Sequence, residues 1–207
     1  MNMDLQEIFK QNSLQYTQDQ NLIDTLWQEI ETQYSEKGRH YHNLEHLSNM
    51  FSEIEVVKTQ ISDFSHLTFS VFYHDIIYIG SSRTNEEKSA ELAKARLQKL
   101  NLEKKSIDHI LEQILATKTH QKSIDNDINY LLDADLSILG KDTPTYLEYT
   151  KKIRKEYSIY PDLLYKPGRK KVLRHFLELE SIFKTYYFKD QYESQARLNI
   201  QYEIDSL

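Results

Sequence analysis

The sequence predicts an all-α fold, and two observations support this prediction. The 207 residues include only four glycines and three prolines, so few positions interrupt regular structure. Between these positions the apolar residues recur at three- and four-residue spacing, which is the period of a helix and not of a strand. We therefore expect residues 1–207 to form one helical domain, a bundle of about eight or nine helices.

The first two predicted helices flank a histidine-rich turn. A stripe of apolar residues opened by Asp19 predicts a helix that ends near Gly38. A second stripe predicts a helix with Asn43 as its N-cap. These stripes consist of Leu22, Leu26 and Ile30, and of Leu44, Leu47, Met50, Phe51 and Ile54.

The middle of the chain predicts three further helices. The third carries Leu67, Val71, His74 and Asp75 and is broken by the glycine and serines at 80–82. The fourth begins at 84–87 and runs to about residue 100. The fifth runs from about residue 106 to 117, and its inward stripe leaves His109 pointing outward.

The remaining helices are separated by glycine and proline. The sixth spans about 127–139 and stops at Gly140, and the seventh starts at Pro144 and continues to about 157. The stretch 160–168 contains two prolines and a glycine, which predicts a loop. Helices over about 169–183 and 189–204 complete the bundle.

Composition excludes several classes of function. A net charge of −6 disfavours binding to a long nucleic acid, because such binding depends on a surplus of lysine and arginine. The absence of cysteine leaves only nitrogen and oxygen to bind a metal. No signal peptide and no apolar run of about 18 residues is present, so we expect a cytoplasmic protein that does not bind membranes. The 15 tyrosines are scattered along the chain, and we interpret them as packing residues.

Asp135 is the residue most in need of a partner. It falls in the middle of the apolar face of the sixth predicted helix, where an ionised carboxylate costs several kcal/mol unless a cation accompanies it. A neighbouring arginine or backbone donors would be the ordinary explanation. Asp133 lies about a third of a turn away, and we expect it to be solvated or to support a ligand from behind.

Two other segments offer donors for the same cation. His74 and Asp75 follow a long apolar run, where an isolated pair would ordinarily be a buried histidine beside a capping or ion-paired aspartate. Upstream, His42 and His46 are four residues apart and share a helix face if the helix begins early enough. The apolar stripe slightly favours His46 as the inward residue, and His40 is expected to face solvent.

These segments, in the order His42, His74-Asp75 and Asp135, resemble the H…HD…D pattern of the HD-domain superfamily of metal-dependent phosphohydrolases. The likeness extends to 39–46, 85–90, 116–120 and 132–140, which are similar to a small bacterial branch of that superfamily, and it covers about 39–185. The resemblance implies His42 as the first metal ligand, His74 and Asp75 as the central and catalytic pair, and Asp135 as the last ligand. It decides for His42 over His46.

The resemblance implies hydrolysis of a phosphomonoester or phosphodiester of a small molecule, with a nucleotide as the expected substrate. One or two divalent ions of Mn, Fe, Co, Ni, Zn or Mg would serve, and Asp75 would orient or deprotonate the attacking water. After His74-Asp75 the chain lacks the Glu-Asp pair of guanosine-tetraphosphate hydrolases, and it has no GYP signature of cyclic-di-GMP phosphodiesterases. Neither activity is expected, and the chain is expected to act as a monomer or homodimer.

Further residues are candidates for a second metal position or for contact with phosphate. They are His46, Glu86 and His120, together with the basic residues Lys118, Arg39, Arg154 and Arg169. Two alternatives use the same site. The first is a di-iron oxygenase of the HD type, which needs about six His and Asp ligands, and the second is a module that binds metal and nucleotide without catalysis.

Overall fold

The computed structural model describes residues 4–207, and in that range every regular element is helical, so the all-α prediction is confirmed. Ten α-helices and two short 3-10 helices lie in this range, slightly more than predicted. The α-helices are α1 (Leu5–Ser13), α2 (Gln20–Tyr34), α3 (Leu44–Val57), α4 (Phe64–Tyr73), α5 (Asn85–Lys99), α6 (Lys104–Ala116), α7 (Asn126–Leu136), α8 (Thr143–Glu156), α9 (Asp162–Glu178) and α10 (Tyr186–Ser206). The 3-10 helices are η1 (Lys58–Gln60) and η2 (Ser137–Gly140).

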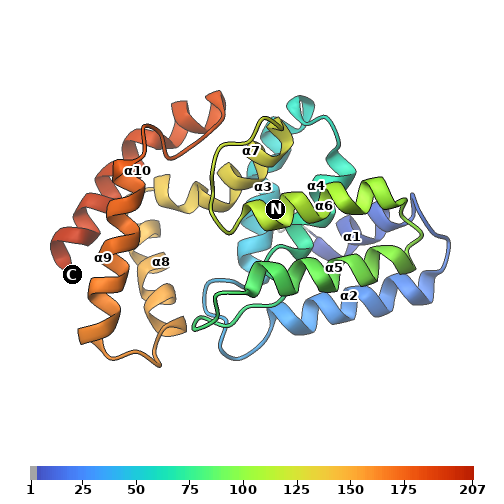
Figure 1. Cartoon of the computed structure of the whole chain (residues 1–207), viewed down its shortest axis with the longest axis horizontal. Helices are drawn as coiled ribbons and strands as arrows, with labels where there is room; N and C mark the ends of the chain where they lie inside the picture. The colour runs from blue at the N-terminus through green and yellow to red at the C-terminus, as the bar shows by residue number, and fades with distance from the viewer. Residues whose placement is uncertain (1–3) are drawn as a thin grey trace.

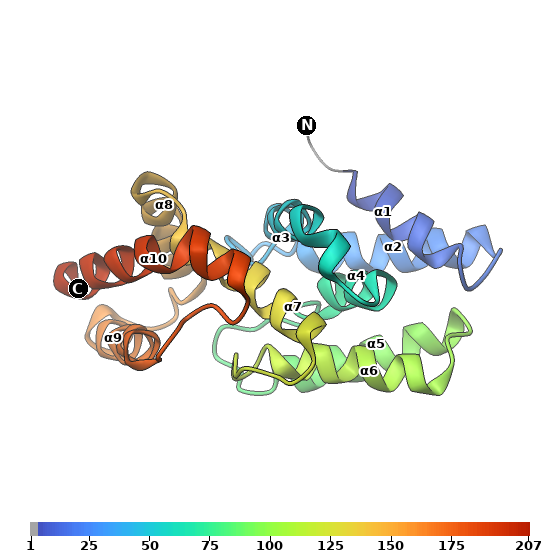
Figure 2. The same ribbon diagram turned by 90° about the horizontal axis from the view of Figure 1, so that it is seen from above.

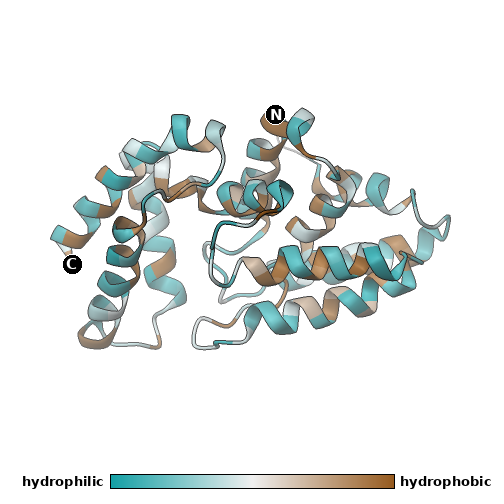
Figure 3. Ribbon diagram, turned by 45° about the horizontal axis from the view of Figure 1, so that its top comes forward, coloured by the Kyte–Doolittle hydropathy of each residue, from teal (hydrophilic) through white to brown (hydrophobic). Residues whose placement is uncertain are grey.

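The helices form two groups that α7 connects. Figures 1 and 2 show α1 to α6 on one side of the molecule, α8 to α10 on the other, and α7 between them. Hydrophobic residues lie along one side of most helices and hydrophilic residues along the other (Figure 3), as expected for helices that share a core. One cluster of buried hydrophobic side chains extends from Leu5 to Ile204. The expectation of one domain stays a prediction.

The core beneath α4 is aromatic. Phe72 is fully buried, and its ring lies 5.3 Å from Phe9, 6.1 Å from Trp27 and 4.9 Å from Phe51, measured between ring centroids. These rings come from α1, α2 and α3, so α4 is held on three sides. Replacing a buried phenylalanine by alanine typically costs about 3 to 5 kcal/mol. The end of α4 is therefore fixed in position, and that end carries His74.

Two predicted helix boundaries were wrong. α4 ends at Tyr73, so His74 is its C-cap and Asp75 lies beyond the helix. The carbonyl oxygens of Asp75 and Ile76 accept hydrogen bonds from Arg39 in place of helical N–H groups. The predicted loop over 160–168 is also wrong, because α9 begins at Asp162 and continues through Pro167. Proline has no main-chain N–H to donate, so two prolines and a glycine in this stretch predict a loop. The helix nevertheless continues through Pro167.

The expectation of solvent exposure was wrong for Asp133 and holds in part for His109. His109 is only half-exposed, because its Nε2 lies 2.7 Å from Oδ2 of Asp125 and its Nδ1 lies 3.1 Å from Nδ1 of His66. Asp133 is fully buried and accepts hydrogen bonds from the N–H groups of Lys184 and Thr185 and from the Thr185 hydroxyl. Asp133 therefore holds the start of α10 on α7. No helix in the described range is both long and apolar enough to cross a bilayer.

Candidate metal centre

Three donor side chains meet where α3 and the end of α4 approach each other. One possible ligand atom from each of His46, His74 and Asp75 lies within 4.8 Å of the other two. The Nε2 of His74 lies 3.4 Å from the Nε2 of His46 and 3.2 Å from Oδ2 of Asp75. The Nδ1 of His74 donates to the carbonyl oxygen of Val71 at 2.9 Å, so the neutral ring presents the Nε2 lone pair to this cluster.

Asp135 reaches the same cluster from α7. Its Oδ1 lies 3.2 Å from the Nε2 of His46 and 3.9 Å from the Nε2 of His74, and its Oδ2 lies 2.9 Å from the Nε2 of His120. Metal–ligand bonds of 2.0 to 2.2 Å place neighbouring donor atoms about 3 to 3.5 Å apart. The contacts of 3.2 and 3.4 Å match this spacing, so His46, His74 and Asp75 can hold one transition-metal ion, with Asp135 beside His46.

The negative charges of Asp75 and Asp135 are mostly buried and therefore need positively charged partners. Within the described chain, Asp75 and Asp135 have only histidines as ionic partners. Burial alone would raise the pKa of Asp75 and of Asp135, but the surrounding imidazoles hold both pKa values well below the usual range. Burial alone would lower the pKa of His74, and the charge of Asp75 instead raises it to about 9. A divalent ion would supply the positive charge that protonated imidazoles otherwise provide. The imidazoles would then be neutral, with Nε2 free to bind the ion.

His42 stands beside this cluster and is held by a different residue. Its Nδ1 donates to Oε2 of Glu156 at 2.6 Å, and its Nε2 lies 3.9 Å from Oδ2 of Asp75. Oε1 of Glu156 accepts the backbone N–H groups of residues 40, 41 and 42 at 2.7 to 2.9 Å. Burial lowers the pKa of His42, but Glu156 and Asp75 outweigh it and raise the pKa above its ordinary value.

Arg39 positions two of the segments that carry the cluster. Its Nη1 donates to the carbonyl oxygens of Asp75 at 2.6 Å and of His42 at 3.2 Å, and its Nη2 donates to the carbonyl oxygen of Ile76 at 2.6 Å. The side chain is almost fully buried and its guanidinium lies 4.8 Å from the centre of the Tyr34 ring. Since these bonds occupy both Nη atoms, the expected contact between Arg39 and substrate is not supported.

His120 adopts a backbone conformation that is uncommon for histidine. Its φ is +50°, in the left-handed region, directly after the C-terminal turn of α6. This conformation aims the ring at Asp135. Residues other than glycine adopt this backbone conformation at a cost of about 1 kcal/mol or more. Such strained residues are typically found at functional sites.

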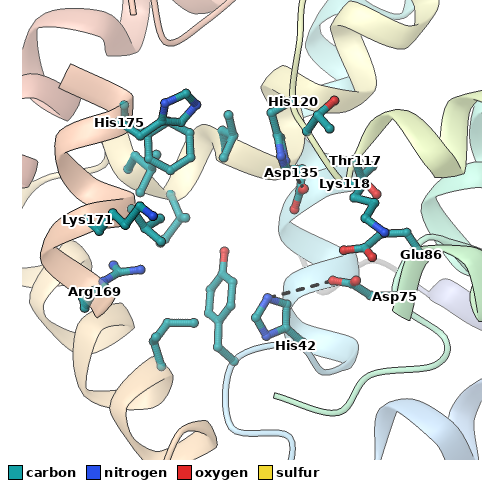
Figure 4. A pocket seen from close by; sticks show the side chains of 18 of the residues that line it. His42, Asp75, Glu86, Thr117, Lys118, His120, Asp135, Arg169, Lys171 and His175 are labelled. Carbon is teal, nitrogen blue, oxygen red and sulfur yellow. Dashed lines mark hydrogen bonds and ion pairs between the residues drawn. The ribbon is translucent and has the colours of Figure 1, made fainter. Parts of the chain in front are cut away.

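A pocket of ≈1540 Å³ opens above the cluster. Figure 4 shows His42, Asp75, Glu86, His120 and Asp135 on one side of it, and Arg169, Lys171 and His175 of α9 on the other. Its lining includes seven lysines and arginines against four aspartates and glutamates, although the whole chain has a net charge of −6. The pocket is therefore suited to an anionic ligand.

The other predicted phosphate-binding residues differ in availability. Glu86 is half-buried and lines the pocket. Lys118 also lines it, but its ammonium contacts Glu87 and the carbonyl oxygen of Arg83. Arg169 lines the pocket while bonded to Glu203.

Arg154 is not among the pocket-lining residues. Its guanidinium binds Asp162 and the carbonyl oxygens of Tyr157 and Tyr160. The prediction that it contacts substrate is not supported.

The sequence-based prediction missed Glu156 and the pocket tyrosines. Glu156 ends α8 and lies 114 residues from His42 along the chain, so no local pattern connects the two. Tyr78 stacks on the His42 ring with 4.0 Å between centroids, and Tyr41 lies 5.0 Å from both the His42 and the His46 ring. The interpretation of tyrosine as general packing therefore needs correction at this site.

Comparison with known proteins gives no relatives: no family model, no curated protein sequence and no solved structure matches this chain.

Proposed function

We propose that this protein is a metal-dependent hydrolase of small phosphate esters, of the HD-domain type. The observation that carries the proposal is the convergence of His46, His74, Asp75 and Asp135 at the base of a pocket with a surplus of basic side chains. Such a pocket attracts a phosphate group, and the four donors suit a divalent ion beside it.

We assign the ion to these four residues, with His46 in place of His42. A divalent ion held by these residues would supply Lewis acidity to a phosphate oxygen and to the attacking water. Oδ2 of Asp75 faces His74, whereas its Oδ1 has no hydrogen-bond partner in the described chain. Asp75 is thus placed to accept a proton from the attacking water.

His42 takes the role of proton donor to the leaving oxygen. Glu156 fixes the proton on Nδ1 and favours the doubly protonated ring, so that Nε2–H is directed towards Asp75 and the pocket. A histidine held in this way donates a proton near neutral pH and returns to the same orientation after each turnover. The side chain of Glu156 is 1 % exposed and acts through His42 as a positioning residue.

The test is phosphate release from a panel of nucleotides and other phosphate esters by protein reconstituted with Mn, Fe, Co, Ni, Zn or Mg. Asp135→Asn is the blank, because it keeps the size of the side chain and removes its charge. We expect release by the unchanged protein only. Equal release by both proteins would mean that the assigned site is wrong.

The two alternatives stay predictions. A di-iron oxygenase needs about six ligands, and the histidines and aspartates gathered here are His42, His46, His74, Asp75, His120 and Asp135. Metal analysis and an absorption spectrum of protein purified without air would reveal a di-iron centre. A non-catalytic module would bind nucleotide without turnover in any metal-loaded form.

A further inference from the structure

Tyrosine is concentrated in the pocket beside the candidate metal centre. Six of the 15 tyrosines in the chain line it. They are Tyr41, Tyr78, Tyr149, Tyr157, Tyr160 and Tyr165. These residues come from four separate parts of the chain, so their scatter along the sequence hides their proximity in the folded protein.

Four of these residues lie next to one another beside the candidate metal centre, and we call Tyr78, Tyr157, Tyr160 and Tyr165 the tyrosine strip. Tyr78 stacks on His42 at 4.0 Å and interacts with the phenol of Tyr157. The Tyr157 ring lies 6.4 Å from Tyr160, with 29° between the ring planes, and 6.1 Å from Tyr165. The strip therefore leads from His42 to the start of α9.

Tyr157 and Tyr160 are half-buried and line the pocket, so they offer ring surface and hydroxyl groups, whereas Tyr165 is buried with the Arg154 guanidinium 4.6 Å from its ring centre. The two arginines beside the strip are already paired, Arg154 with Asp162 and Arg169 with Glu203. Burial raises the pKa of Tyr157 and of Tyr165, so their phenols stay protonated. Because these two arginines are engaged by carboxylates, a flat uncharged group finds aromatic surface here on which to stack.

We propose that the tyrosine strip binds a planar aromatic ring of the substrate, so that the phosphate ester held at the metal centre carries a nucleobase or another aryl group. The inference rests on the proposed function, because it takes the phosphate group of the substrate to be bound at the metal centre. It adds that the organic part is recognised by stacking, and it predicts poor use of esters that carry only a sugar or an aliphatic chain.

Tyr160 is the member of the strip best suited to a test. It is half-buried, lines the pocket, and packs on Tyr157 without contacting any of the four assigned metal ligands. Tyr160→Leu removes the ring and keeps an apolar side chain, whereas Tyr160→Phe keeps the ring. Tyr202→Leu is the matched control, because Tyr202 is 55 % exposed on α10 and lies outside the pocket lining.

The experiment compares three esters with the metal-loaded protein: adenosine 5′-monophosphate, p-nitrophenyl phosphate and ribose 5-phosphate. Stacking contributes about 1 to 3 kcal/mol per ring, so Tyr160→Leu is expected to raise the KM of the ring-bearing esters about ten-fold. The KM of ribose 5-phosphate should not change, and Tyr160→Phe should restore the preference for a ring. A preference for adenosine monophosphate over p-nitrophenyl phosphate would identify a nucleobase as the ring, and the reverse an aryl group.

A second readout separates this inference from the proposed function. Calorimetric titration measures binding of adenosine 5′-monophosphate and ribose 5-phosphate whether or not turnover occurs. The inference predicts that the ring-bearing ester binds more tightly than ribose 5-phosphate, and that Tyr160→Leu weakens this binding whereas Tyr202→Leu does not. This result would support stacking on the tyrosine strip even if no phosphate is released. Equal affinity for the two esters, or equal affinity in Tyr160→Leu and the unchanged protein, would overturn the inference. If the inference is overturned in this way but phosphate is still released, the proposed function stands.

Discussion

Oε2 of Glu156 lies 2.6 Å from Nδ1 of His42, and this contact joins the end of α8 to the turn before α3. The other oxygen of the same carboxylate binds three successive N–H groups of that turn. One buried carboxylate thus fixes both the backbone and the ring of the proposed proton donor.

Glu156→Gln should reduce turnover without releasing the metal. The amide lacks the charge that raises the pKa of His42, so Nε2 will be deprotonated at neutral pH. Loss of a general acid typically costs about 100-fold or more in kcat. The pH profile of kcat, measured with metal content by mass spectrometry, tests this. An unchanged profile would show that Glu156 does not act through His42.

His46→Gln and His42→Gln should have different effects. Removing His46 takes away one of the four spaced donors, so we expect the protein to lose most of its bound metal. Removing His42 should leave metal content close to that of the unchanged protein while turnover falls. Metal analysis after dialysis distinguishes the two roles, and loss of metal in His42→Gln alone would restore the ligand assignment that the resemblance implies.

Arg39→Lys should destabilise the protein. A lysine has one ammonium where the guanidinium binds three carbonyl oxygens, and the carbonyl oxygens left without a donor cost about 1 to 3 kcal/mol. Denaturant unfolding of the metal-free protein measures this loss, and metal titration should show weaker binding because Asp75 is less well placed. Lys99→Arg, on the exposed last turn of α5, provides the control for the charge-conserving exchange.

The ion pair between Glu29 and Arg96 should make stability depend on pH. Arg96 donates through Nε and Nη2 at 2.6 and 2.7 Å, and this hydrogen bonding lowers the pKa of Glu29 below 4.5 in spite of burial. The folded-state pKa is the lower one, so the pair stabilises the protein above pH 4.5 and the contribution is lost as pH falls through the folded pKa. Glu29→Gln should cost roughly 0.5 to 1 kcal/mol at pH 7 and less at pH 3. Thermal melts at both pH values test this.

The helices with regular apolar stripes could be predicted from sequence, because their periodicity is local. α2 and α3 begin after the predicted caps Asp19 and Asn43. Asp135 could be singled out for the same reason, since its position on an apolar helix face is visible in the sequence. The proximity of His74, Asp75 and Asp135 agrees with the expectation that these segments converge.

Other features depend on contacts between distant residues and could not be predicted. The role of proton donor that we propose for His42 depends on Glu156, whose side chain reaches the turn from the end of α8. The continuation of α9 through Pro167 opposes the local preference of proline. Arg39 was predicted to face substrate because its charge suits phosphate, and no local pattern shows that three carbonyl oxygens surround it.

The burial of Asp133 limits how far the protein can be truncated from its C-terminus. Its carboxylate is 0 % exposed, and the donors that satisfy it are all supplied by the first residues leading into α10. A chain cut after Phe183 would strand that charge inside α7, two residues before Asp135, at a cost of several kcal/mol. The shortest polypeptide able to assemble the candidate centre therefore extends at least through Thr185, although neither Lys184 nor Thr185 is assigned to the ion.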